Sequence, residues 1–345
     1  MHLGPFLLTG ISIALLVGPS ETQAQTYHPI TQIAVGGEGG WDYLSEDAAG
    51  RRLYVSHATK VVVIDLDHHT VVGEIDSLPG VHGFAVAPSL GLGYASNGRE
   101  NTAAIVDLAT LRIKTRVPTG ENPDAILFVP GPAEVYTFNG RGKSATVFDA
   151  ATGKVVATIP LSGKPEFAVY DSAAGRIYNN IEDRNEIAVI DVHSHDVVAT
   201  WPITPGEAAS GLAIDLAHHR LFAVCENQLM VMLDSQTGKV VTTVPIGSGV
   251  DAARFDPGTG LAFASNGEGS VTIAHEDSPN RLTVVQTLPS LRSARTMTLD
   301  PTTHRIYLSA AELEPAPTPA PGERRQRPRM VPGSFRVLVF GPGKN

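Results

Sequence analysis

One aromatic side chain returns seven times along the 345-residue chain at nearly constant spacing. The aromatics are Tyr54, Tyr94, Tyr136, Tyr178, Phe222, Phe263 and Tyr307, at intervals of 40, 42, 42, 44, 41 and 44 residues. After each comes a β-rich run, such as "VVVIDLD" or "IAVIDVH", then a turn and another alternating run. Six of these later runs end in proline, which suits an edge strand, where a missing N–H is tolerated. Four short strands in each period of about 42 residues predict an all-β fold, a seven-bladed β-propeller.

The seventh repeat is one strand short. It contains predicted strands near residues 295–300, 305–310 and 335–340, whereas the other repeats contain four. Residues 28–36, "HPITQIAVG", form a spare strand near the N-terminus. We expect this segment to pair with 335–340 and complete the last blade, because closure removes the open edge of a sheet.

Two stretches of the repeats resemble a known family. Residues 149–180 read "DAATGKVVATIPLSGKPEFAVYDSAAGRIYNN", and residues 234–266 read "DSQTGKVVTTVPIGSGVDAARFDPGTGLAFASN". Both are similar to repeats of the YVTN-repeat, YncE-like family of bacterial secreted seven-bladed propellers. The resemblance extends over nearly all of residues 28–345. It implies the propeller fold and no single shared activity.

The N-terminal segment and the net charge bear on location. Residues 6–17, "FLLTGISIALLV", are too short an apolar run to span a bilayer, and small residues follow at Thr22 and Ala24. We expect residues 1–24 to be a secretory signal peptide cleaved after Ala24, although it has no Lys or Arg before the apolar run. Cleavage removes one acid, Glu21, and changes the formal charge from −9 to 26 − 34 = −8. This acidity disfavours nucleic acid as a partner.

Residues 25–345 are then expected to be a single propeller domain. We expect it to be periplasmic or secreted, to be a monomer and to have no membrane span. Cys225 is the only cysteine, so no internal disulfide is available, and a lone cysteine of this kind is typically a small buried hydrophobe.

Aligning the repeats on their aromatic places a polar residue at the start of the first strand of every blade. Glu166 is unusual at this position, because burying a carboxylate costs free energy and an apolar run, "FAV", follows it directly. First strands line the central channel, so this first set is expected to ring one mouth. The set is Asp42, His82, Asp124, Glu166, Ser210, Asp251 and Arg295.

A second set lies three residues after each aromatic, where the second strand ends. It comprises His57, Asn97, Asn139, Ile181, Cys225, Asn266 and Ala310. In blade 4, Asn180 and Glu182 flank Ile181, so a one-residue shift of register would bring either into the set. Adjacent strands are antiparallel, so the end of the second strand and the start of the first lie at the same end of a blade. We therefore expect both sets to line one mouth.

Two classes of function fit these residues. A binding protein would hold a small polar or anionic ligand, a metal ion or a partner protein at the mouth. A metal-assisted enzyme of the lactonase or lyase type would use His57 or His82 as a base and Asp124 or Glu166 as its partner or a metal ligand. Arg295 would then stabilise an anion. No nucleophile motif such as GxSxG supports covalent catalysis.

A divalent metal ion is the cofactor that these residues suggest. Asp42, His57 and His82 come from adjacent blades, and a set of histidine and carboxylate suits zinc or another first-row ion. The ligands are dispersed and match no compact metal motif. The alternative is that the polar residues are merely solvated, with Arg295 bridging Asp251 and Asp42.

Other histidines fall in turns at the opposite end of the blades. His68, His69, His193, His195, His218, His219 and His304 are interpreted as solvated turn residues. The segment "GGEGG", residues 36–40, is similar to a phosphate-binding loop, but a strand follows it where such a site needs a helix. It is interpreted as a flexible lead into blade 1.

One segment breaks the repeat between the second and third strands of blade 7. Residues 313–333, "LEPAPTPAPGERRQRPRMVPG", are rich in proline and favour a stiff, extended excursion on the ring face. The insertion carries four arginines: Arg324, Arg325, Arg327 and Arg329. A lid or docking arm above the acidic ring and a disordered insertion are both open interpretations.

Overall fold

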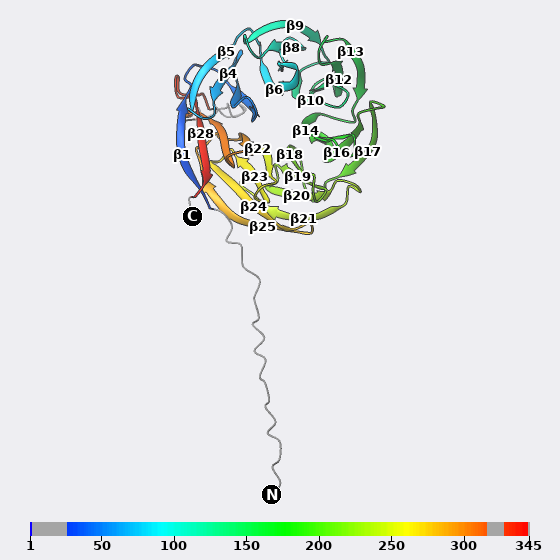
Figure 1. Ribbon diagram of the computed structural model, residues 1–345, viewed down its shortest axis with the longest axis vertical. Coiled ribbons are helices and arrows are strands. Elements are labelled where there is room, and N and C mark those ends of the chain that lie inside the picture. The colour runs from blue at the N-terminus through cyan, green and yellow to red at the C-terminus, as the bar shows by residue number, and fades with distance from the viewer. Residues whose placement is uncertain (2–25, 316–327, 344–345) are drawn as a thin grey trace, which may run out of the picture.

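The computed structural model describes residue 1, residues 26–315 and residues 328–343. In this part of the chain, seven four-stranded antiparallel sheets are arranged around a central channel (Figure 1). The predicted all-β seven-bladed propeller is confirmed. The predicted signal peptide lies outside the described residues apart from Met1.

In each blade four strands run outward from the channel, in sequence order except for the outermost strand of blade 7. Blade 1 contains β2 (Trp41–Asp47), β3 (Arg52–His57), β4 (Lys60–Asp65) and β5 (Thr70–Ile75). Blade 2 contains β6 (Val81–Ala87), β7 (Leu92–Asn97), β8 (Thr102–Asp107) and β9 (Arg112–Pro118). Blade 3 contains β10 (Pro123–Val129), β11 (Glu134–Asn139), β12 (Ser144–Asp149) and β13 (Val155–Pro160). Blade 4 contains β14 (Pro165–Asp171), β15 (Arg176–Ile181), β16 (Glu186–Asp191) and β17 (Asp196–Pro202).

The remaining blades follow the same plan. Blade 5 contains β18 (Ala209–Asp215), β19 (Arg220–Cys225), β20 (Leu229–Asp234) and β21 (Val240–Pro245). Blade 6 contains β22 (Val250–Asp256), β23 (Leu261–Asn266), β24 (Ser270–Ser278) and β25 (Arg281–Pro289). Blade 7 contains β26 (Thr296–Asp300), β27 (Arg305–Ala310), β28 (Arg336–Pro342) and β1 (Tyr27–Ala34). Two short 3₁₀ helices, η1 (Pro88–Leu90) and η2 (Glu182–Arg184), lie in connecting turns. No helix among the described residues is long and apolar enough to cross a membrane.

The predicted closure of the ring is confirmed. Strand β1 pairs antiparallel with β28, from Tyr27 opposite Pro342 to Ala34 opposite Arg336. The two ends of the chain therefore lie side by side in blade 7, β1 in blue and β28 in red (Figure 1). Ile33 of β1 is buried in the apolar cluster between blades 7 and 1, so the strand contributes packing as well as backbone hydrogen bonds.

The apolar core lies between neighbouring blades. Successive side chains of a strand point to opposite faces, so Tyr54 packs toward blade 2 while Val55 packs toward blade 7. The Tyr54 ring stacks on Phe84 of blade 2 with 4.6 Å between ring centroids. Burial of both faces explains why the inner strands read as nearly continuous apolar runs. Side chains that point into the channel are exempt from this packing, and the polar residues of the first strands are among them.

Candidate functional site: a polar chamber at one end of the channel

A break in strand pairing frees the first-set side chains from the sheet. In blades 1 to 6 the register between the first two strands shifts at the start of the first strand, as between Val81 and Phe84 or between Pro165 and Ala168. His82 and Glu166 lie within these two irregular stretches. A β-bulge re-aims a side chain locally. The same irregularity therefore occurs at the first-set residue of six blades. In the seventh blade, the first-set residue Arg295 directly precedes β26.

The first set converges as predicted. Six of its seven members line one cavity of about 410 Å³ at the end of the channel where the first strands begin: Asp42, Asp124, Glu166, Ser210, Asp251 and Arg295. The seventh, His82, contacts two of them. We call this cavity the polar chamber. The binding role of these residues stays a prediction, but their convergence is a property of the fold.

The closest group in the polar chamber joins blades 1, 2 and 3. His82 Nδ1 lies 2.6 Å from Asp42 Oδ2 and 3.7 Å from Asp124 Oδ1. Ligand atoms of these three residues lie within 4.8 Å of one another, close enough to share one metal ion. Burial alone would lower the pKa of His82, but the hydrogen bond to Asp42 and the negative charges nearby outweigh it and raise the pKa to about 9.

A second group is centred on Lys164. Its Nζ lies 2.6 Å from Glu166 Oε1 and also contacts Glu182 Oε2. Glu166 is buried, with 7% of its surface exposed, which is drier than a solvated mouth would be. Burial, with the charge of Asp124, raises the pKa of Glu166 to about 8 despite the opposing effect of Lys164. Glu166 therefore stays protonated up to a higher pH than an ordinary glutamate does.

The third group joins blades 6 and 7. Arg295 Nη1 lies 2.8 Å from Asp251 Oδ2, so the predicted bridge between these residues is present. Burial raises the pKa of Asp251 to about 7, with Arg295 opposing the shift and Asp42 adding to it. Burial likewise raises the pKa of Asp124 to about 6.

Negative charge is in excess in the polar chamber. Six carboxyl groups line it, those of Asp42, Asp124, Glu166, Glu182, Glu226 and Asp251. Only two cationic side chains, Lys164 and Arg295, line it with them, and His82 stands beside. Raised carboxyl pKa values follow from burial together with this crowding, since each charge disfavours the next. The chamber is therefore arranged to attract a cation.

Sequence reasoning missed Lys164 and Glu226 as lining residues. Glu226 and Glu182 occupy the same place in the repeat, four residues after the aromatic, where the other five blades have Gly or Ala. Lys164 lies two residues before the first-set position, where no other blade has a charged residue. A search for charges at otherwise uncharged repeat positions would have found both. Glu182, which the one-residue shift of register already suggested, lines the chamber with them.

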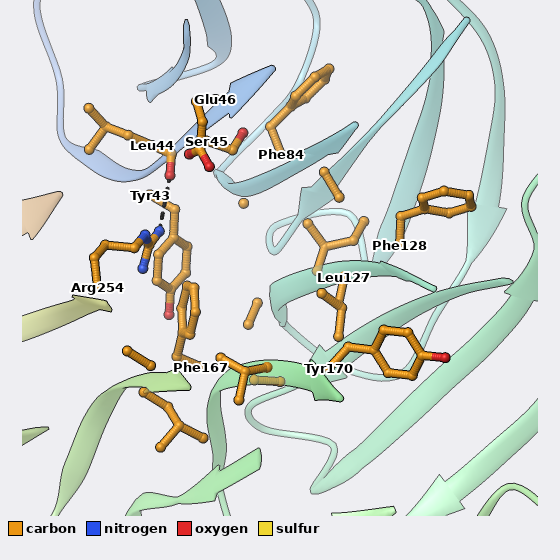
Figure 2. A pocket seen from close by; sticks show the side chains of 18 of the residues that line it. Tyr43, Leu44, Ser45, Glu46, Phe84, Leu127, Phe128, Phe167, Tyr170 and Arg254 are labelled. Atoms are coloured by element: carbon orange, nitrogen blue, oxygen red, sulfur yellow. Dashed lines mark hydrogen bonds between the residues drawn. The ribbon is translucent and has the colours of Figure 1, made fainter. Parts of the chain in front are cut away.

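Two aromatic rings divide the channel below the polar chamber. Tyr43 and Phe167 come from opposite sides of the channel and meet with 5.5 Å between ring centroids (Figure 2). Each follows a first-set residue, and the other blades have only Gly, Ala or Thr at that place. Tyr43 lines the polar chamber and also a second cavity of about 430 Å³.

The second cavity is mainly apolar. Phe84, Leu127 and Phe128 line its wall, and Arg254 and Glu46 bring it charge (Figure 2). The Arg254 guanidinium lies over the Phe167 ring at 4.7 Å from its centroid and donates to the backbone oxygen of Ala253 at 2.7 Å. The Tyr43 ring therefore lies between this cavity and the polar chamber.

The second set does not line the polar chamber, which corrects the prediction. Its asparagines are buried inside the blades. Asn139 donates to Ser144 Oγ at 3.1 Å and Thr146 Oγ1 at 3.0 Å, and Asn266 makes the same bonds to Ser270 and Thr272 at 3.0 and 3.1 Å. These side chains tie the second strand to the third.

Two further asparagines are also buried, Asn97 of the second set and Asn180, which flanks the set in blade 4. Asn97 donates to Thr102 Oγ1 at 3.3 Å within blade 2. Asn180 donates to the backbone oxygens of Ser210 and Gly211 at 3.0 Å and ties blade 4 to blade 5. The antiparallel order of the strands correctly predicted at which end of the blade the second set lies. It did not take into account that the second strand is farther from the channel axis than the first.

His57 is likewise removed from the candidate bases and metal ligands. Its ring is 1% exposed and stacks on Phe335 with 4.2 Å between centroids. Burial lowers its pKa. Of the predicted metal set, Asp42 and His82 come together, and Asp124 takes the third place. Cys225 is fully buried, as interpreted, and burial raises the pKa of its thiol to about 12.

The turn histidines lie at the opposite end of the blades, as the antiparallel order of the strands requires. His68 and His193 are solvated, with 79% and 83% of their side chains exposed. His195 is not: its Nε2 lies 2.9 Å from Glu134 Oε2. The interpretation of His195, His218 and His304 as merely solvated is wrong, because each contacts a carboxylate that is itself largely buried.

Part of the Pro/Arg-rich insertion can be placed. Leu313 and Met330 form an isolated antiparallel bridge at its base. Arg329, Arg295 and Trp41 line a cavity of about 740 Å³ beside the polar chamber. Arg324, Arg325 and Arg327 lie outside the described residues, so the lid interpretation stays a prediction.

Comparison with known proteins adds no family to this picture. No family model matches the chain, and no significant match is found among curated proteins.

Proposed function

We propose that this protein is a binding propeller whose polar chamber takes a small cationic ligand. The observation that carries the proposal is the charge imbalance: six carboxyl groups line the chamber against two cationic side chains. A rigid ring of blades that each contribute one or two side chains suits binding without further machinery. The sequence alone also suggested anionic ligands, and the excess of carboxylates makes them the weaker candidates.

A divalent metal ion is the cation that the geometry favours. Asp42, His82 and Asp124 offer two carboxylate oxygens and one imidazole nitrogen within 4.8 Å of one another. This mixture suits Zn²⁺ or Mn²⁺. Binding would displace the proton that the carboxylates hold on His82, so affinity should rise with pH. Glu166 and Asp251 line the same chamber and add to its negative charge when ionised.

A metal-assisted lactonase- or lyase-type enzyme is the second candidate. The observation that favours it is the pKa of Glu166, raised to about 8, which suits a general acid near neutral pH. In that case His82 and Asp124 hold the ion, Glu166 moves the proton, and Arg295 meets a developing negative charge. His57, buried behind the sheet, has no part in it.

The test is titration of the metal-free protein with ZnCl₂, MnCl₂ and the diamine putrescine, with glucuronate as the anionic arm. One bound equivalent of a cation whose affinity Asp124→Asn weakens at least tenfold supports the proposal. His68→Ala, in a solvated turn at the other end, is the control and should bind as the parent does. Binding of glucuronate without any of the cations would overturn it. Turnover of lactones by the metal-loaded chain would favour the second candidate.

The family and the location are part of the same proposal. The repeat resemblance to the YVTN-repeat, YncE-like propellers and the apolar segment before Ala24 support a secreted or periplasmic protein acting as a monomer. Determination of the N-terminal residue of the mature protein tests the location, because cleavage after Ala24 predicts Gln25.

A further inference from the structure

A second buried carboxylate breaks the repeat at the opposite end of the propeller. Glu276 belongs to β24 and occupies the place that immediately follows the aspartate, or in this blade His275, near the end of the third strand. Blades 1 to 5 have an apolar or small residue at this place: Leu66, Leu108, Ala150, Val192 and Ser235. Glu276 is nevertheless 7% exposed. A carboxylate at an apolar, buried position requires a compensating partner.

The surroundings of Glu276 differ from those of its equivalents. In blades 2 and 4 the repeat tyrosine donates to the backbone oxygen at this place of the next blade, Tyr94 to Ala150 and Tyr178 to Ser235. Blade 5, which precedes Glu276, carries Phe222 and has no hydroxyl to donate. Strands β24 and β25 are each nine residues long and are the longest in the described part of the chain. The enlarged hairpin reaches blade 5, where Arg220 Nε donates to the backbone oxygen of Pro279 at 2.5 Å.

Glu276 meets a histidine and a second buried carboxylate from blade 5. His218 Nδ1 lies 2.7 Å from Asp215 Oδ2 and 3.3 Å from Glu276 Oε1. Ligand atoms of the three residues lie within 4.8 Å of one another. Neither carboxylate oxygen of Glu276 makes a hydrogen bond of good geometry with a described side chain or backbone group. The nearby guanidinium of Arg220 is already matched by Asp234, at 2.8 Å.

We propose that Asp215, His218 and Glu276 form a second metal site, for a first-row divalent ion such as Zn²⁺, that joins blades 5 and 6. Two carboxylates and a neutral imidazole carry a charge of −2, which a divalent cation balances. The half-exposed His218 leaves one side open for water to complete the coordination. Without an ion the two carboxyl groups compete for a proton. Burial, followed by the effect of Asp215, raises the pKa of Glu276 to about 7.

The site is independent of the polar chamber, and the experiment keeps them apart. In a chain carrying His82→Ala, the chamber loses its only imidazole, so high-affinity zinc binding that remains reports on the second site. We expect isothermal titration of this chain with ZnCl₂ at pH 7.5 to give one equivalent bound. Adding His218→Ala should weaken binding at least tenfold. Adding His304→Ala should leave it unchanged, because His304 pairs with one buried carboxylate, Asp256, at 2.7 Å and belongs to no such triad.

A stability measurement covers the case in which a variant loses zinc binding because its fold is damaged. Glu276→Leu restores the residue of blades 1 and 2 and should raise the melting temperature of the metal-free protein, because a buried carboxyl group is removed. The same variant should lose the rise in melting temperature that ZnCl₂ gives the His82→Ala chain. Equal zinc affinity with and without His218 would overturn the proposal, and so would equal zinc stabilisation with and without Glu276. In either event the three residues only share a proton. A failure here leaves the cation proposal for the polar chamber untouched, since that is tested in the chain with His82 intact.

Discussion

His82 Nδ1 lies 2.6 Å from Asp42 Oδ2, and the two side chains come from neighbouring blades. The pKa of His82 is raised to about 9, above the ordinary value near 6.5, so the protonated form stabilises the fold. That stabilisation is complete below about pH 6.5 and disappears as the pH rises through about 9.

The first prediction follows from this pair. His82→Gln should lower the free energy of unfolding at pH 6 by about 2 kcal/mol, and the difference should shrink toward pH 10. Urea denaturation of the metal-free proteins at a series of pH values measures it. A constant difference from pH 6 to pH 10 would show that His82 is not protonated by its carboxylate neighbours.

The second prediction concerns Glu166. With a pKa of about 8, its carboxyl group is mainly protonated at pH 7 in the empty protein, and glutamine imitates that form. Glu166→Gln should therefore change the free energy of unfolding by less than about 1 kcal/mol at pH 7. Cation affinity should fall, because glutamine cannot ionise when a cation arrives. Parallel losses of stability and affinity at pH 7 would instead mean that Glu166 only stabilises the start of blade 4 through its ion pair with Lys164.

The third prediction separates the buried second set from the chamber. Asn266→Ala removes the donor to Ser270 and Thr272 and should destabilise the protein by about 1–3 kcal/mol, as the loss of buried hydrogen bonds does. Asn139→Ala in blade 3 is the matched variant and should behave alike. Neither should alter cation binding at temperatures where the protein stays folded. Loss of binding without loss of stability would return these residues to the site.

The fourth prediction concerns closure of the ring. Ile33 of β1 is 4% exposed and lies opposite Val337 of β28. Ile33→Asp places a charge in that core and should destabilise the fold by about 3 kcal/mol or more. A displaced β1 exposes the edge of β28 to other chains, so the variant should form oligomers as its concentration rises. Sedimentation velocity is the measurement. A variant as monomeric and stable as its parent would show that β1 is dispensable.

The first set could be predicted from the sequence because residues at the same place in each repeat occupy equivalent positions around the channel. Seven copies of the aromatic set the register, and the bulge follows the same register in six blades. The second set failed for a physical reason. Polar residues also satisfy one another inside a sheet, as Asn139, Ser144 and Thr146 do, and polarity alone does not separate this from exposure to a ligand.

Departures from the repeat carried the information that averaging over blades discards. Glu182 and Glu226 replace the Gly or Ala of other blades and turn toward the chamber, while Glu276 replaces an apolar residue and turns into a junction between blades. Whether an unusual residue lines the chamber or lies between two blades depends on its contacts with the neighbouring blade. The spacing of the repeats in the sequence does not reveal those contacts.

Strands β1 and β28 are the first and the last strands of the chain, yet each is the other's partner. A ribosome therefore releases β1 long before β28. Blades 1 to 6 have all their strands before then, so they can form while the first strand is still unpaired. Closure of the ring therefore has to wait for β28. A chain that stops before β28 retains two unpaired strand edges, that of β1 and that of β27, which are open to pairing with other chains.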